Sequence, residues 1–461
     1  MNILALTTGA AACLVLEVLA GPHALGAVLL AIAGIAFLFR NSMARLAWLV
    51  GGGLLVFGGE SVGAPKLAYL ASAGLVAIFS ASRVYRSDAT WLRPFRPILS
   101  ATILLALMLT VSLFVAIDEN GFMNWLRDAA PYLLLIVAPV VALDAAHEIR
   151  ESTVMRMAVL FGSVAAVGFT TDWLNRRGIS ALPVGRFVAG SGVVANCGFA
   201  FALALVVSGP RRWFWAAIAT AIPATMLTTG SRSLIGMGVA FIGILGRRSR
   251  HRMGPVRIAA LVLCVGGLLA YSVPRLMGVI STDPAFLDQR IAAAQSVLAG
   301  EGADDGSYAA RAESYDWAMA AWQSHRWLGT GPGFLYPRGS FTLDTPLLIV
   351  AKFGIIGTAV LAIYMATLLL CTRSAARKFG WRPAHTGLRA FALIVLVLLP
   401  LAPAFDDKGF AFTIALVLAA AGAAARTGAE AESLGLDKDG ASDPGEAEAM
   451  LKLDLMGSRT T

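Results

Sequence analysis

Long apolar runs, separated by short polar segments, dominate the chain up to about residue 426. Read at roughly 17–22 residues each, the runs are long enough to cross a bilayer as helices. The pattern predicts an all-α polytopic membrane bundle of about 12–14 transmembrane helices. The first run, Asn2 to Leu19, has no basic n-region, and another run follows almost at once. We therefore interpret it as a retained helix rather than a signal peptide.

Composition supports a membrane protein and excludes a soluble one. Hydrophobic residues make up 57% of the 461 residues and charged residues only 14%, which is outside the range of soluble globular domains. The four cysteines all lie in or beside apolar runs, so neither a disulfide framework nor a cysteine metal site is indicated. These cysteines are Cys13, Cys197, Cys264 and Cys371.

Arginines fall in alternate loops and so predict the orientation of the bundle. Clusters occur at positions 40–45, 83–96, 150–156, 211–212, 247–257 and 373–389, and loops rich in Lys and Arg are normally cytoplasmic. Both termini are then inside. The net charge of +9 is explained by these loops, and no nucleic-acid motif accompanies it.

This topology divides the chain into five parts. Residues 1–171 and 172–274 are predicted to be the amino-terminal and central membrane helices, 275–345 an extracytoplasmic loop with short helices, and 346–426 the carboxy-terminal membrane helices. Residues 427–461 are acidic and rich in small residues, which is typical of a disordered cytoplasmic tail.

Several arginines are predicted on the outer side, where basic residues are uncommon. Arg232 lies in the short turn from Thr228 to Ser233, and an arginine there requires an anionic partner or an ion pair. Arg176, Arg177 and Arg186 precede it; they either guide an anionic donor or face lipid phosphates.

The predicted outer loop contains two helical patterns, Pro284 to Leu298 and Ser307 to Ser324, separated by a Gly- and Asp-containing break. One face of the second helix carries two tyrosines, a tryptophan and an arginine. This face either docks the helix on the bundle or also binds a sugar and a phosphate. Its members are Tyr308, Arg311, Tyr315, Ala318 and Trp322.

A glycine-rich run follows, from Ser324 to Phe334. It is not a dinucleotide-binding loop, since no strand precedes it. It allows a tight turn or a close approach of backbone to a ligand. Beyond Arg338 the chain re-enters the membrane through Leu343 and Asp344.

These motifs, in this order and on this side, resemble the superfamily of O-antigen ligases and Wzy-type polymerases. The resemblance rests on Thr229–Ser233, on Arg311 ahead of His325–Gly333, and on Phe353–Gly357. It implies a glycosyltransferase of the bacterial inner membrane, with its active site facing the periplasm and no cofactor or metal. The implied partners are an undecaprenyl-diphosphate-linked oligosaccharide, a glycan acceptor, membrane lipids and a chain-length regulator. The family arginines that hold the diphosphate would correspond to Arg232 and Arg311.

One departure favours a polymerase. Ligases of this family resemble one another in a His-Asn pair before the returning helix, where this chain has Leu343 and Asp344. A ligase, and a flippase for the same lipid-linked glycan, remain as alternatives. Against a flippase, the sequence shows no internal repeat of the kind that transporters carry.

Candidate catalytic residues follow from the chemistry of a lipid-diphosphate leaving group, which requires neutralisation of negative charge. Arginines suit this because they stay protonated and bind oxygens in a fork. For the general base, Asp344 leads over His325, Glu313 and Asp316, although an Asp at that position is also a typical helix cap. Further candidate substrate-binding residues are Tyr315, Trp322, Arg326 and Arg338, and Asn196, inside an apolar run, is expected to bond a neighbouring helix or to line the site.

Overall fold

The computed structural model describes the helical part of the chain, namely residues 34, 38, 40–57, 64–176, 191–227, 233–249, 306–343, 345–399 and 404–433. Most of these residues form helices, and the only strand-like pairing among them is a bridge between Tyr336 and Ser340. The helices are α3 (Ser42–Ala47), η1 (Trp48–Gly52), α4 (Gly53–Val56), α5 (Ala64–Arg86), η2 (Thr90–Phe95), α6 (Arg96–Asn120), α7 (Phe122–Ala146), α8 (Glu151–Arg176), α10 (Gly192–Ser208), α11 (Arg212–Leu227), α12 (Ser233–Ser249), α15 (Gly306–Ser324), η4 (Pro337–Gly339), α16 (Leu348–Phe379), α17 (Pro383–Leu398), η5 (Ala404–Asp406) and α18 (Lys408–Ser433).

Six of the described helices are long and apolar enough to cross a membrane. They comprise α5, η2 with α6, α7, α8, α16 and α18, and shorter apolar helices are formed by Ser42–Val56, Gly192–Ser208 and Pro383–Leu398. This confirms the predicted class, an all-α polytopic membrane protein. The predicted spans before residue 34 and the predicted helix from Pro284 to Leu298 lie outside the described residues.

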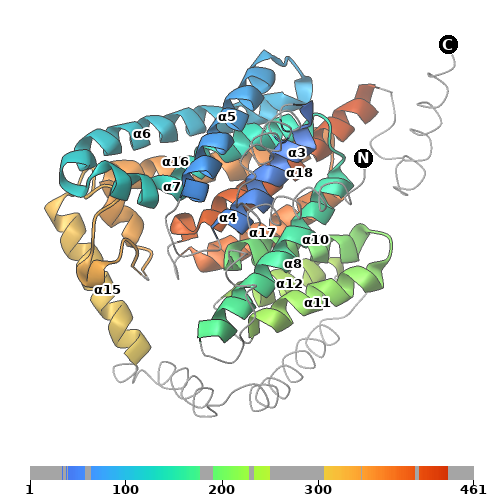
Figure 1. Ribbon diagram of the computed structural model, residues 1–461. Coiled ribbons are helices and arrows are strands. Elements are labelled where there is room, and N and C mark those ends of the chain that lie inside the picture. The colour runs from blue at the N-terminus through green and yellow to red at the C-terminus, as the bar shows by residue number, and fades with distance from the viewer. Residues whose placement is uncertain are drawn as a thin grey trace, which may run out of the picture.

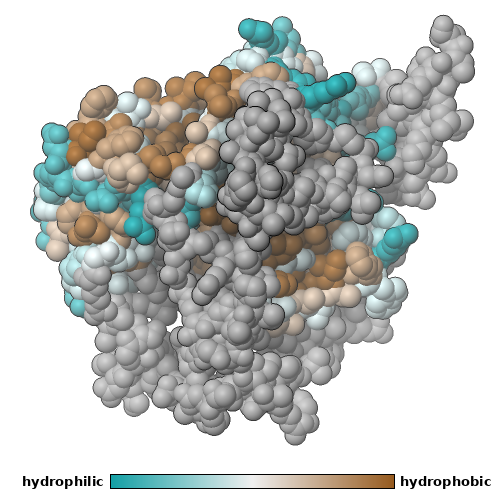
Figure 2. All heavy atoms as spheres, viewed as in Figure 1, coloured by the Kyte–Doolittle hydropathy of each residue, from teal (hydrophilic) through white to brown (hydrophobic). Residues whose placement is uncertain are grey.

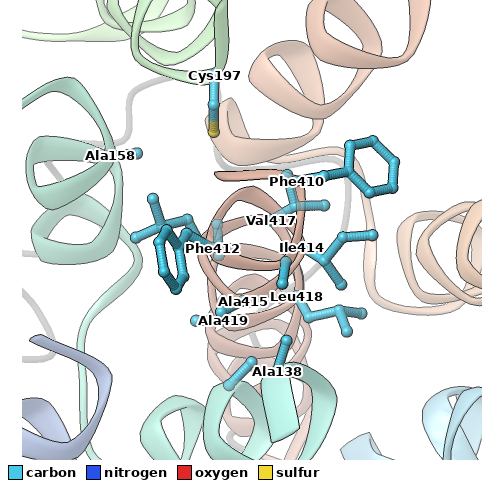
Figure 3. Packing of buried hydrophobic residues seen from close by; sticks show 14 of the residues in the cluster. Ala138, Ala158, Cys197, Phe410, Phe412, Ile414, Ala415, Val417, Leu418 and Ala419 are labelled. Carbon is cyan, nitrogen blue, oxygen red and sulfur yellow. The ribbon is translucent and has the colours of Figure 1, made fainter. Parts of the chain in front are cut away.

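Helices α7 and α18 form the centre of the bundle (Figure 1). Both are buried along almost their whole membrane-spanning length. Figure 3 shows Phe412 and Ile414 of α18 among side chains from α7, α8 and α10. Small residues allow such close contact between helices; a Cβ atom added to Gly198 of α10 would lie 2.6 Å from the Cα of Gly162 in α8.

The outer helices present apolar side chains outwards. Along α6 the exposed set includes Ile103, Leu107, Val111 and Phe114, and Figure 2 shows hydrophobic residues gathered over this part of the molecule. Because a large exposed apolar surface is unfavourable in water, this face is the one that contacts lipid.

One end of the bundle, here called the arginine-rich end, is held by a buried ion pair. The guanidinium of Arg45 is fully buried and its Nε donates to the Asp144 carboxylate over 2.7 Å. Ser80 donates to the same carboxylate, and Arg83 pairs with Glu148 over 2.7 Å. The network joins α3, α5 and α7, so loops predicted to share one side of the membrane do meet at one end.

Helix α18 also ends there, and it continues past the predicted end of the membrane region. Arg426 donates to the backbone carbonyls of His147 and Ile149 at the end of α7. The helix then extends to Ser433, into the segment predicted as a disordered tail. Its alanines and glutamates favour helix, and Arg426 pairs with Glu430 one turn later, over 3.7 Å.

Candidate functional site

A loop from His325 to Leu347 covers the opposite end of the bundle, here called the loop end. It packs on the ends of α6, α7 and α16. The Asn120 side chain at the end of α6 donates to the carbonyls of Thr330 and Pro332 over 3.0 and 3.2 Å. The backbone N–H of Gly333 donates to the Asp128 carboxylate of α7 over 2.7 Å.

The same loop supplies hydrogen-bond partners to backbone groups at a break in α16. At Gly354 the backbone leaves the helical conformation, with φ 60° and ψ −164°, which deprives nearby peptide groups of their helical partners. Backbone groups of the loop take the place of these partners. Loop N–H groups donate to the carbonyls of Ala351 and Lys352, over 2.9 Å each, and loop carbonyls accept from the N–H groups of Ile355 and Ile356, over 3.0 and 3.2 Å. Since unpaired backbone groups are costly at membrane depth, loop and broken helix stabilise each other.

The glycine-rich run makes this contact possible. Gly329, Gly331 and Gly333 all have positive φ, of 72°, 77° and 88°, a conformation that side chains disfavour. A Cβ atom would lie 2.3 Å from the Lys352 carbonyl at Gly329 and 2.6 Å from the Trp125 nitrogen at Gly333. The predicted tight turns are therefore present, and the close approach that the glycines allow is to the backbone of α7 and α16.

A buried lysine lies directly beneath this contact. Lys352 has no exposed surface, and its ammonium donates to Asp128 of α7 over 2.6 Å and to Asp406 of η5 over 2.7 Å. The Tyr132 hydroxyl donates to Asp406 over 3.1 Å. One cation thus joins two carboxylates from segments far apart in sequence, and the group carries a net negative charge if all three are ionised.

Sequence reasoning missed this network, although a signal for it existed. Asp128 and Lys352 are charged residues inside apolar, membrane-spanning helices, and such residues are usually paired or functional. Nearby, Tyr336 is 2% exposed, and burial raises the pKa of its hydroxyl to about 12. Tyr336 therefore remains neutral beside Lys352.

The predicted site residues of α15 and the loop are mostly at the surface. His325 and Arg326 are exposed, and His325 shares a hydrogen bond of 2.9 Å with the adjacent Ser324. Tyr315 is 39% exposed, whereas Trp322 is half-buried. The candidate bases Glu313 and Asp316 are half-buried and exposed, respectively.

Helix α15 docks through small residues, one of which, Ala318, belongs to the predicted stripe. Ser314, Ala318 and Ala321 are buried, and Ala318 and Ala321 pack in a small cluster with Tyr336, Leu343 and Leu348, among others. Of the described predicted stripe, only Ala318 is fully buried. Small side chains allow the helix to approach α16 closely, which leaves Tyr315 to the outside.

The structure does not describe the side chains of the other predicted site residues. Arg177, Arg186, Arg232 and Asp344 lie outside the described residues. Arg176, Arg311 and Arg338 belong to α8, α15 and η4, but their side chains are not among those described. Their predicted roles remain predictions.

Among the described residues, Asn196 of α10 forms no side-chain hydrogen bond to a neighbouring helix. Its side chain is fully buried, and neither the amide oxygen nor the nitrogen has a hydrogen-bond partner in the described part of the chain. A buried amide without partners is destabilising.

Asn196→Leu is therefore expected to stabilise the protein by about 1–3 kcal/mol. The change would be read from thermal unfolding of the purified protein in lipid nanodiscs. As a comparison, Cys197→Leu, at a fully buried neighbour on the same helix, enlarges the core without removing an amide and should destabilise. A less stable Asn196→Leu would mean that the amide has a partner.

Taken together, membrane-length apolar helices and a broken helix clamped by a glycine-rich loop define an integral membrane protein with an organised site at one end. Residues 216–351 match the family model described as Wzy_C: O-Antigen ligase. The match confirms the resemblance to the O-antigen ligase and polymerase superfamily, whose Wzy_C members are glycosyltransferase-like enzymes. No curated protein matches the chain. The matched segment contains α12, α15 and the loop, and Lys352 follows its last residue.

Proposed function

We propose that this protein is a polysaccharide polymerase of the bacterial inner membrane, which transfers undecaprenyl-diphosphate-linked repeat units to a growing glycan at the periplasmic face. The match of residues 216–351 to the O-antigen ligase model carries the proposal. The matched loop lies at the end of the bundle opposite the arginine-rich end. By the positive-inside rule the loop end then faces the periplasm.

The proposed donor-binding residues are Arg232 and Arg311. Helix α10 begins at the loop end, because Ser191 donates to Asp407 there. Following the chain, α11 ends at the loop end at Leu227, five residues before Arg232, and α15, which contains Arg311, packs on α16. Arg232 is thus close in sequence to the loop end, and Arg311 belongs to a helix that packs there. There they would neutralise the diphosphate as the anomeric bond breaks.

A buried leucine supports a polymerase over a ligase. Leu343, which stands where related ligases resemble one another in a histidine, is 5% exposed and packs in an apolar cluster. In a ligase, the side chain at this position would have to reach the acceptor hydroxyl to take its proton. In this protein the position is occupied by Leu343, which is buried in the apolar cluster. Asp344, the next residue, is the proposed general base.

Replacing Arg232 or Arg311 with alanine is expected to abolish long glycan chains in cells that make the cognate polysaccharide, because the leaving diphosphate loses a charge partner. Lysine at either position should restore little, since it lacks the guanidinium fork. The measurement is glycan length by gel, with the amount of protein in the membrane checked in parallel. Arg212→Ala, an exposed arginine at the start of α11, is the control and should leave chain length unchanged. Normal chains in both arginine variants would contradict the proposal.

A deletion strain separates the polymerase from the ligase. Loss of a polymerase leaves single repeat units on the acceptor, whereas loss of a ligase leaves long chains on the lipid carrier. We expect single units, and long carrier-linked chains would assign the protein to the ligases instead.

A further inference from the structure

Two large apolar side chains near the start of the loop lie outside the protein core. Trp327 is 67% exposed and Leu328 is 40% exposed. Their backbone is nevertheless held against α16. The Trp327 carbonyl accepts from the N–H of Ile356 over 3.2 Å, and a Cβ atom at Gly354 would lie 2.6 Å from the Leu328 nitrogen. The backbone is thus fixed, while the two side chains face outwards.

Trp327 and Leu328 lie at the start of an exposed apolar stripe on α16. Ile356, Ile363 and Leu370 are exposed and recur about every two turns, so they share one face of the helix. This face contacts lipid for the same reason as that of α6, since a large exposed apolar surface is unfavourable in water. The loop meets the stripe at its first turn, where Ile355 and Ile356 donate their N–H groups to it. The two loop side chains are therefore continuous with the lipid-facing surface.

The length of α16 places this point near a membrane boundary. An α-helix rises about 1.5 Å per residue, so the stretch from Ile355 to the exposed Arg373 is about 27 Å long. The hydrocarbon core of a bilayer is about 30 Å thick. With Arg373 at the boundary near the arginine-rich end, Ile355 and the loop beside it lie near the boundary at the loop end.

Helix α6 gives the same level for the loop. Its exposed side chains are charged at Arg96, mostly apolar along the helix, and charged again at Asp118 and Glu119. The stretch from Arg96 to Asp118 is about 33 Å long, which is again close to the thickness of the hydrocarbon core. Asn120, directly after these carboxylates, donates to the loop. The loop therefore meets both helices at the height where the hydrocarbon core ends.

The side chains at this point suit the membrane interface. Tryptophan favours the headgroup region because its indole ring is apolar but carries an N–H donor. The exposed Arg326 directly precedes Trp327, and an arginine there extends its apolar stem along lipid while its guanidinium reaches the headgroup phosphates. Leu328 adds apolar surface without a polar group that would need water.

We propose that Trp327 and Leu328 form a membrane anchor, which inserts into the headgroup region of the bilayer at the loop end. The partner of this surface is the phospholipid bilayer itself. The anchor sets the depth of the glycine-rich run, because Trp327 and Gly333 belong to one loop whose backbone bonds α16 and the Asp128 carboxylate. Anchoring requires no substrate, and it holds whether the protein is a polymerase or a ligase.

A nitroxide spin label measures the depth of the anchor. Leu328→Cys is introduced into the full-length protein with its four native cysteines replaced by alanine, and the labelled protein is placed in phosphatidylcholine nanodiscs. Electron paramagnetic resonance then gives the collision rates of the label with oxygen, which concentrates in lipid, and with a water-soluble nickel chelate. Two reference labels are Phe114→Cys on α6, at a side chain 74% exposed towards lipid, and Gln323→Cys, at an exposed polar residue of α15.

We expect the oxygen-to-nickel collision ratio of the Leu328→Cys label to exceed that of the Gln323→Cys label severalfold and to approach that of the Phe114→Cys label. Adding Trp327→Ser should lower the ratio of the Leu328→Cys label severalfold, because the larger apolar side chain of the anchor is lost. Trp381→Ser, at a tryptophan that is 52% exposed near the opposite end, is the matched control and should leave the ratio unchanged.

Three results would overturn the anchor. A ratio equal to that of the Gln323→Cys label would place the loop in water. Slow collisions with both oxygen and the nickel chelate would mean that another protein segment or a second copy of the chain, rather than lipid, covers the two side chains. A ratio that does not change on Trp327→Ser would show that Trp327 does not hold the loop in the bilayer.

Discussion

Replacing Lys352 with methionine is expected to destabilise the protein by about 3–5 kcal/mol, the usual cost of removing one partner of a buried ion pair. Lys352 is fully buried and supports both Asp128 and Asp406, over 2.6 and 2.7 Å. Its removal leaves two carboxylates close together without a cation. We expect a lower unfolding temperature in nanodiscs and reduced amounts of folded protein in the membrane.

Two further variants show whether charge is the cause. Adding Asp128→Asn and Asp406→Asn to Lys352→Met removes all three charges and should recover most of the lost stability. Lys378→Met, an exposed lysine near the other end of the same helix, should change stability by less than about 0.5 kcal/mol. A Lys352→Met protein as stable as the Lys378→Met protein would contradict this account.

The membrane architecture was predictable because its signals are local. A bilayer requires long apolar helices, and each can be recognised in one stretch of sequence. Arginine placement predicts sidedness in the same way. In the structure, α3 and α5 bring Arg45 and Arg83, from two of the predicted loop clusters, to one end of the bundle. The side of the membrane that this end faces stays a prediction.

The candidate site was predictable only in part. The sequence located the glycine-rich run but not its partners, since Gly333 bonds Asp128, which lies 205 positions away. Likewise nothing in the sequence joins Lys352 to Asp128 and Asp406, which come from two other segments. Each is a charged residue next to or within an apolar run, which indicates that it needs a partner but does not identify that partner.

For the face of α15, the sequence left two roles open, docking on the bundle or also binding a ligand, and small residues received less weight than aromatic ones. On a soluble surface, tyrosine and tryptophan at helical spacing commonly mark the buried side. Here Ala318 and Ala321 dock the helix and Tyr315 is exposed. Close packing between helices in membranes favours small residues, so the alanines were the better guide.

Gly329→Ala is expected to release the loop from the broken helix. The added Cβ would lie 2.3 Å from the Lys352 carbonyl, which the loop cannot accommodate while keeping its hydrogen bonds to Ala351, Lys352, Ile355 and Ile356. Losing several of these bonds, each worth about 1 kcal/mol net, should destabilise the loop end by about 3 kcal/mol or more. Hydrogen exchange of residues 351–356, measured by mass spectrometry, should become faster, and the glycan chains made in cells should shorten.

Gly339→Ala is a matched control for Gly329→Ala. It introduces the same backbone strain but no steric clash of the new Cβ atom with another part of the chain. The φ of Gly339, 70°, is almost the same as the 72° of Gly329, but a Cβ atom there would meet nothing within 4 Å. Gly339→Ala therefore carries only the cost of a left-handed alanine, about 1–2 kcal/mol, and exchange at residues 351–356 should stay slow. If both variants speed exchange equally, backbone conformation alone accounts for the glycines. If only Gly329→Ala does, the glycine-rich run is needed because another backbone occupies the space that a side chain would fill.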